Sequence, residues 1–180
     1  MEFRERLQKK KEAIIQRWLN ETLATYADEA AAAFGREKDP FANPVGHSLR
    51  GGTRGIFEAL LEGTDVDETH EYLHEILRIR AVQQFSPSQS LGFVFALKKA
   101  IRAEVGGAAA DPRFAAEIAE IEERIDQIAL AAFDIFIQCR EQVFELRVNE
   151  AKRRVSWIVD KMNERELDSE FAQIDSGEEV

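Results

Sequence analysis

The last third of the chain offers a single uninterrupted stretch for one helix, and this feature limits the possible folds more than any other. No Pro or Gly occurs between Phe114 and Met162, and these two residue types are the ones that most disfavour a helix interior. At a rise of about 1.5 Å per residue, such a helix would be about 70 Å long, which exceeds the width of a domain of this size. Part of the helix therefore needs a surface beyond its own domain to cover its apolar side chains.

Apolar residues follow this helix in three zones. From Phe114 to Cys139 they alternate at spacings of four and three, which gives one face for packing on other helices. From Phe133 to Val148 they occur on nearly every side, as is typical of a central helix surrounded by others. A narrow apolar seam with charged flanks then follows, and it consists of Val148, Ala151, Val155, Ile158 and Met162.

Two partners could cover this seam: a second copy of the chain, or the first helix of the same chain. A narrow seam with charged residues on both sides is typical of a two-stranded coiled coil. A helix that packs on its own domain usually has a wider apolar stripe. We therefore favour a contact between two copies, which makes a homodimer the expected state.

Composition narrows the class of protein. The 180 residues carry a net charge of −10 with 32% charged and 44% hydrophobic residues, which suits one helix-rich domain. The sequence lacks the excess of Lys and Arg that is expected of a nucleic-acid-binding protein. The one cysteine, Cys139, cannot form an intrachain disulfide. Without a signal peptide or a long apolar run, we expect a cytoplasmic protein that does not insert into a membrane.

Five helical segments and no convincing strand are predicted, so the fold class is all-α. Asn43 with Pro44, Ser86 with Pro87, and Asp111 with Pro112 are typical helix starts, in which a polar cap precedes a proline at the first helical position. The predicted segments are 2–26, 43–62, 65–84, 86–105 and 112–165. We expect residues 1–165 to form one domain. Residues 166–180 hold six acids and no Lys or Arg, and this composition predicts a disordered tail.

His70-Glu71-x-x-His74 matches the helical pattern of zinc proteases, in which two imidazoles bind the metal and the Glu deprotonates its water. No later histidine could supply a third imidazole, and the apolar face of this helix turns Glu71 away from the core. A zinc metallohydrolase is therefore only the second alternative function. We expect neither a resident cofactor nor catalytic residues.

The segment 43–62 suggests a first alternative, a sensor for a small anion or another ligand. His47, Arg50 and Arg54 line one side at helical spacing and lie close to the positive end of that helix. The competing interpretation is a solvated basic face, with glycines on another side that allow close packing of helices.

Arg80 falls on an apolar helix face, and Asp134 falls within an apolar run of the long helix. Buried charges need partners, so we predict an ion pair between Arg80 and Asp134.

Three stretches together resemble a known family. They are DPFANPVGHSLR at 39–50, RIRAVQQFSPSQ at 78–89 with GFVFALK at 92–98, and CRE…ELRVNE at 139–150. This combination resembles the N-terminal domain of RsbRD-type co-antagonists of the RsbT kinase, including its standalone bacterial forms. The resemblance covers about residues 5–160.

The resemblance implies an all-helical sensory or protein-interaction domain of a bacterial stress-response regulator, with regulatory protein partners. Related co-antagonists place a dimeric, globin-like domain without haem before a STAS output domain, joined by a long helix. A globin-like arrangement and a plain helical bundle both remain open for this chain. The family supplies no catalytic residues, and none of the three histidines stands in a recognisable haem-ligand context. The expected function is therefore a non-enzymatic regulatory domain.

Overall fold

The computed structural model describes residues 3–36, 39, 41–83 and 85–175, and it describes side chains for all of these except 28–29, 163–164 and 166–175. The described residues form six α-helices, linked in part by short 3-10 turns, and contain no strand. The α-helices are α1 (Phe3–Leu23), α2 (Asp28–Arg36), α3 (Pro44–Glu62), α4 (His70–Val82), α5 (Pro87–Val105) and α6 (Ala115–Asp175). The all-α prediction is confirmed.

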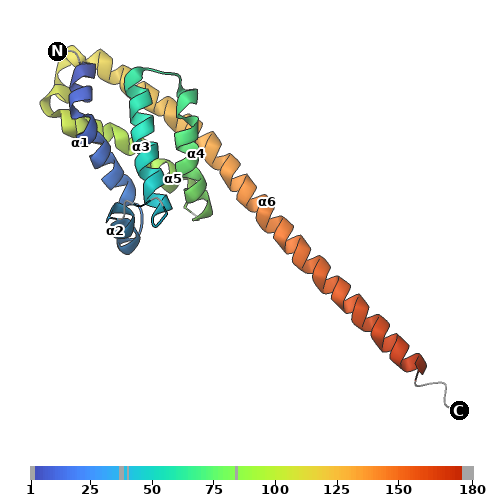
Figure 1. The fold of residues 1–180 in the computed structure, drawn as a ribbon. Helices are drawn as coiled ribbons and strands as arrows, with labels where there is room; N and C mark the ends of the chain where they lie inside the picture. Colours follow the sequence, from blue (N-terminus) through green and yellow to red (C-terminus); the bar gives the residue numbers. More distant parts are fainter. Residues whose placement is uncertain (1–2, 37–38, 40, 84, 176–180) are drawn as a thin grey trace. The chain divides into compact units, whose positions relative to one another are not determined.

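The chain divides into two units, residues 1–140 and residues 141–180. The first unit holds α1 to α5 and the beginning of α6, and the second holds the rest of α6 (Figure 1). None of the described helices combines the length and hydropathy needed to cross a membrane.

The first unit is a helical bundle with one apolar core. In it α1 packs against α3 and α5, and α3 packs against α4 (Figure 1). Trp18 of α1 is fully buried, stacks on Phe93 of α5 and donates its indole N–H to the carbonyl oxygen of Phe93 at 2.6 Å. The predicted inner face of the long helix is confirmed, because the following α6 residues belong to this core: Ile118, Ile121, Ile125, Ile128, Ala132, Ile135 and Cys139.

Helix boundaries follow the capping residues that the sequence offers. The Asn43 side chain accepts the N–H of Gly46 at 2.8 Å at the start of α3, and Gly63 ends this helix in the left-handed conformation, with φ of 73°. At the start of α5, Ser86 and Gln89 cap each other's backbone N–H groups in a capping box. Gly106 ends α5 with φ of 58°, a value that favours glycine.

Several predicted boundaries differ from the structure. Helix α2, an Ala-rich helix of nine residues, was not predicted. The third predicted helix begins as a 3-10 turn over Val66–Thr69 before α4 starts at His70. Helix α6 continues to Asp175, so the first part of the acidic segment is helical, whereas 176–180 lie outside the described residues.

The expectation of a central helix over Phe133–Val148 is wrong. In the first unit, Phe133 is 46% exposed, and in the second, Phe144 and Leu146 are 62% and 66% exposed. Apolar residues on many sides of this stretch do not reflect burial on many sides. Instead, one side of α6 packs into the core of the first unit, while other apolar side chains remain at the surface.

Candidate functional site

The predicted seam lies in the second unit, where almost every described side chain is exposed. Val143 is the single half-buried residue between Glu141 and Met162. The exposed fractions of the large seam residues are 42% for Val148, 60% for Val155, 50% for Ile158 and 58% for Met162. A soluble protein rarely leaves such a regular apolar row uncovered. The seam is therefore the main candidate for a contact surface.

Phe144 extends the seam by one step, and the sequence analysis missed it. It precedes Val148 by four residues, which continues the alternating spacing of the seam, and it is 62% exposed. The sequence pattern instead places Phe144 in the stretch Phe133–Val148, which it predicts to be a surrounded central helix. Extending the spacing of the seam backwards from Val148 would have found it.

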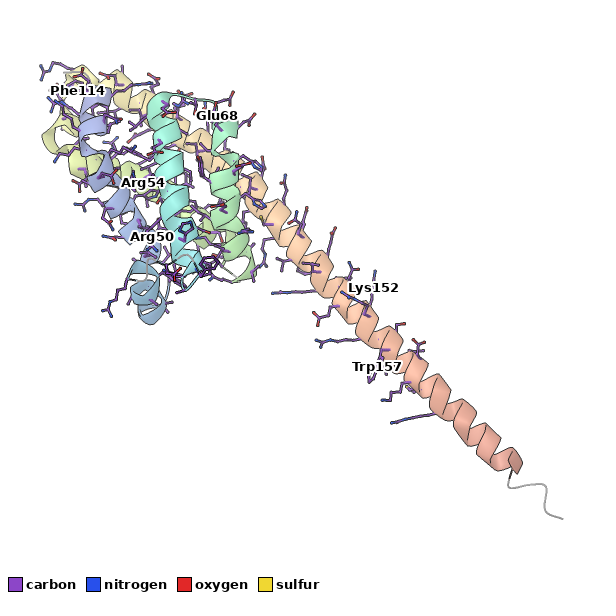
Figure 2. The ribbon with its side chains drawn as sticks, in the orientation of Figure 1. Arg50, Arg54, Glu68, Phe114, Lys152 and Trp157 are labelled. Atoms are coloured by element: carbon purple, nitrogen blue, oxygen red, sulfur yellow. The ribbon has the colours of Figure 1, made fainter. Side chains whose placement is uncertain are left out.

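Trp157 is, with Leu146 and Val159, one of the exposed large apolar residues of this unit outside the seam, and Figure 2 shows it on the distal part of α6. At 100° per residue, it lies well away from Val155 and Ile158 around the helix. The ammonium of Lys161 lies 4.8 Å from the centroid of its ring, which is within the range of a cation–π contact. The indole therefore has partial cover from its own helix.

The cationic strip on α3 is largely engaged by the protein itself. Arg54 binds both carboxylate oxygens of Glu12 at 2.7 Å, and this pairing lowers the pKa of Glu12 and raises that of Arg54. Arg50 donates to the carbonyl oxygen of Phe34 at 2.9 Å. His47 is exposed near the start of the helix, and Figure 2 places Arg50 and Arg54 along α3. An anion at this strip would have to compete with these existing acceptors.

The glycines of α3 serve helix packing. A Cβ on Gly52 would lie 2.6 Å from Ile76 of α4, and a Cβ on Gly55 would lie 2.5 Å from the ring of Tyr72. The competing interpretation from sequence, close packing through glycine, accounts for both positions.

The His70–Glu71–His74 motif does not assemble a metal-binding set from the described residues. The two imidazole rings lie parallel, with centroids 6.3 Å apart, and both His70 and Glu71 are exposed. In the described part of the chain, no group of three His, Cys, Asp or Glu side chains is placed to hold a metal ion. A catalytic zinc site needs at least three protein ligands.

Arg80 is fully buried, as its place on an apolar face required, but the predicted ion pair with Asp134 is wrong. Asp134 is exposed, whereas Arg80 donates to neutral oxygens: the carbonyl of Gln89 at 2.9 Å, the hydroxyl of Thr25 at 3.1 Å and the carbonyl of Thr22 at 3.4 Å.

Aromatic rings complete the surroundings of the Arg80 guanidinium. Its central carbon lies 5.2 Å to 5.3 Å from the ring centroids of Tyr26, Phe85 and Phe93, where the negative ring faces offset part of the cost of burying a cation. Burial lowers the pKa of Arg80 and raises the pKa of the Tyr26 phenol, which the nearby positive charge opposes. This cluster holds α1, α4 and α5 together, and its contacts are with the protein.

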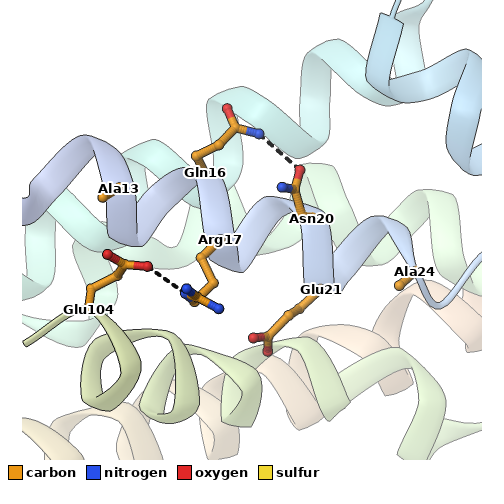
Figure 3. Close-up of a pocket in the computed structure, with 7 residues that line it drawn as sticks. All are labelled: Ala13, Gln16, Arg17, Asn20, Glu21, Ala24 and Glu104. Carbon is orange, nitrogen blue, oxygen red and sulfur yellow. Dashed lines mark hydrogen bonds and ion pairs between the residues drawn. The ribbon is translucent and has the colours of Figure 1, made fainter. Parts of the chain in front are cut away.

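A hollow of about 510 Å³ lies between α1 and α5, and four of the five polar side chains that line it are paired with each other, Glu21 being the exception (Figure 3). Arg17 binds Glu104 at 2.6 Å, and the Gln16 amide donates to Asn20 at 2.9 Å. The hollow therefore offers little unsatisfied polar chemistry to a ligand.

Comparison with known proteins decides the family. The family model described as the RsbT co-antagonist protein rsbRD N-terminal domain matches residues 12–151. The chain belongs to this family. No curated protein and no solved structure matches the chain.

The RsbT co-antagonist N-terminal domain is a regulatory domain of signalling proteins, and membership implies a role in protein–protein interaction. The match begins within α1 and ends at Ala151, inside the seam. The later seam residues Val155, Ile158 and Met162 lie beyond the part of the chain that the family model covers.

Proposed function

We propose that this chain is a non-enzymatic regulatory module that works as a homodimer in the bacterial cytoplasm, joined by two α6 helices along the seam. In this proposal residues 1–165 act as one sensor and interaction domain, and the acidic segment 166–180 follows it. One observation carries the proposal: a regular row of exposed apolar side chains in a unit that consists of one helix. Pairing with a second copy would bury this row.

The alternating spacing assigns each seam residue to a coiled-coil position. Val148, Val155 and Met162 take the a positions, and the d positions are Phe144, Ala151 and Ile158. In parallel coiled coils, β-branched residues at a combined with leucine at d favour two strands. Two of the three a positions here are valine, which meets the first half of this rule, whereas none of the three d positions is leucine.

Charges beside the seam favour a parallel pair. In an antiparallel pair that aligns all six core residues, Lys152 would face Lys152 of the second copy, Arg154 would face Arg154, and Arg147 would face Lys161. Each of these contacts is repulsive. In a parallel pair Arg154 faces Val159 of the second copy. Among the described side chains of the seam, Arg147 opposite Lys152 is then the one kind of repulsive pair, and it occurs twice by symmetry. Flanking charges set helix orientation in coiled coils, so the parallel arrangement is the one proposed.

Sedimentation velocity of the full chain at about 50 micromolar tests the proposal, since even a weak pair associates at such concentrations. Val155→Asp places a charge in the seam and should convert the dimer to a monomer. The matched control Ser156→Asp adds the same charge to the neighbouring exposed position and should remain dimeric. A monomeric unmodified chain, or equal behaviour of the two variants, would contradict the proposal.

A further inference from the structure

A groove of about 430 Å³ lies where the beginning of α3 meets the end of α4. The two helices pack side by side in opposite directions, so these two ends come together (Figure 1). The walls are mainly apolar, with Pro44 and Val45 from α3 and Ile79 and Val82 from α4. Val82 is 59% exposed although it belongs to an otherwise well-packed helix. The groove is within the usual size range of small-molecule sites.

Arg78 gives this apolar groove a positive charge. It lines the groove, its side chain is exposed, and none of the hydrogen bonds or ion pairs among the described residues involves it. This distinguishes Arg78 from Arg54, which is paired with Glu12, and from Arg50, which donates to a carbonyl oxygen. A ligand carboxylate at the rim would accept charge-assisted hydrogen bonds from this exposed guanidinium, and such bonds are among the strongest in proteins.

The first turn of α3 adds positive potential at the same place. Pro44 and Val45, which line the groove, are the first residues of that helix. The N-terminal end of a helix carries a partial positive charge from its aligned peptide dipoles. The groove thus combines an apolar wall with two sources of positive potential, one of them an exposed arginine side chain.

We propose that this groove binds a small amphipathic carboxylate, such as a medium-chain fatty acid. Its carboxylate binds the guanidinium of Arg78, and its hydrocarbon chain lies along Val45, Ile79 and Val82. Because the walls of the groove are apolar, the ligand needs a hydrocarbon chain. Because Arg78 is positively charged, a carboxylic acid binds better than an alcohol of the same length. The site lies within residues 1–140, so the inference does not depend on the proposed dimer.

Isothermal titration calorimetry of the full chain with octanoate tests the inference, with octanol and acetate as probes of each half of the ligand. We expect octanoate to bind with a dissociation constant in the millimolar range or below, and both octanol and acetate to bind more weakly. Arg78→Gln should weaken octanoate binding by about tenfold and leave octanol binding unchanged. Val82→Asn should weaken both octanoate and octanol.

Lys99→Gln is the matched control, because Lys99 is an exposed cation of α5 outside the groove. It should bind octanoate like the unmodified chain. Circular dichroism confirms that each variant is folded. Failure of octanoate to bind, or equal losses from Arg78→Gln and Lys99→Gln, would overturn the inference. Binding of an acidic peptide in the absence of octanoate binding would also overturn it, in favour of a protein-docking groove.

Discussion

Substitution of Arg80 gives the sharpest test of how the core of the first unit is held together. The side chain is fully buried, and every partner among the described residues is neutral. We expect the neutral variant Arg80→Met to be more stable than Arg80→Lys, which keeps the charge. This order is the opposite of the one that charge conservation would suggest.

Two opposing terms set the size of the effect for Arg80→Met. Hydrogen bonds from a charged donor each stabilise by about 1.5–3 kcal/mol, whereas burial of a cation costs several kcal/mol. The hydroxyl of Thr25 donates to the carbonyl oxygen of Thr22 at 2.7 Å, so Arg80→Met does not leave this oxygen without a hydrogen bond. The free energy of unfolding should therefore change by no more than about 2 kcal/mol.

The Arg80→Lys variant keeps a buried positive charge and the cost of desolvating it, but it loses the planar guanidinium group that donates to several acceptors at once. We expect it to cost about 3–5 kcal/mol, the usual range for a buried charge with too few partners. This cost has an upper limit, because the buried lysine can instead lose its proton and become neutral. Lowering the pKa of a lysine from about 10.4 to below 7 corresponds to about 5 kcal/mol.

Urea denaturation followed by circular dichroism measures these differences, at one fixed protein concentration. A pH series adds a check with a defined sign. In Arg80→Lys the folded-state pKa of the introduced ammonium would lie below its unfolded value, so the unfolded state would bind more protons. The variant should therefore gain stability relative to Arg80→Met as the pH rises from 7 to 9. If Arg80→Lys proves the more stable variant, a carboxylate partner such as Asp134 must compensate the charge, and our description of the cluster is wrong.

Two further predictions concern α3 and the single cysteine. Gly46→Ala should destabilise the chain by about 1–3 kcal/mol in thermal unfolding, because its Cβ would overlap the backbone oxygen of Phe34. The matched variant Gly51→Ala meets no atom within 4 Å and should stabilise by up to about 1 kcal/mol; equal effects would refute the packing argument. Cys139 is buried, and burial raises the pKa of its thiol, so Ellman's reagent at pH 7 should modify it only after unfolding. Rapid modification of the native chain would contradict this.

The sequence was most informative where a local chemical rule decides the structure. Asn43 before Pro44 and the Ser86–Gln89 capping box each marked a helix start correctly, because the side chain satisfies backbone N–H groups of its own first turn. Helix α2 carries no comparable signal: it is short and rich in alanine, so no apolar periodicity separates it from the neighbouring link.

Tertiary contacts were harder to predict. The apolar face around Arg80 correctly indicated burial, but the choice of Asp134 as partner assumed that a carboxylate must balance the charge. The structure instead balances it with aromatic rings and neutral oxygens from α5 and from the turn that follows α1. Which distant segments supply such groups depends on the packing of the bundle, and one helix pattern alone cannot reveal it.

The same limit applies to the ligand site. The positive charges on α3 are visible in the sequence, but their availability depends on Glu12 and Phe34, which approach from other helices. The cation at the groove, Arg78, belongs to α4, and it comes next to the first turn of α3 only through the antiparallel packing of the two helices.

Disulfide trapping within the seam tests the central claim most directly. In a chain with Cys139→Ser, Ala151→Cys would place one thiol at the core of the proposed pair. In a parallel pair the two copies of residue 151 face each other, so mild oxidation should convert the 20.5 kDa chain almost completely to a covalent dimer of twice that mass. The control Ser156→Cys lies outside the seam and should cross-link slowly. Equal cross-linking of the two variants, or a chain that stays monomeric, would show that α6 does not pair along this surface.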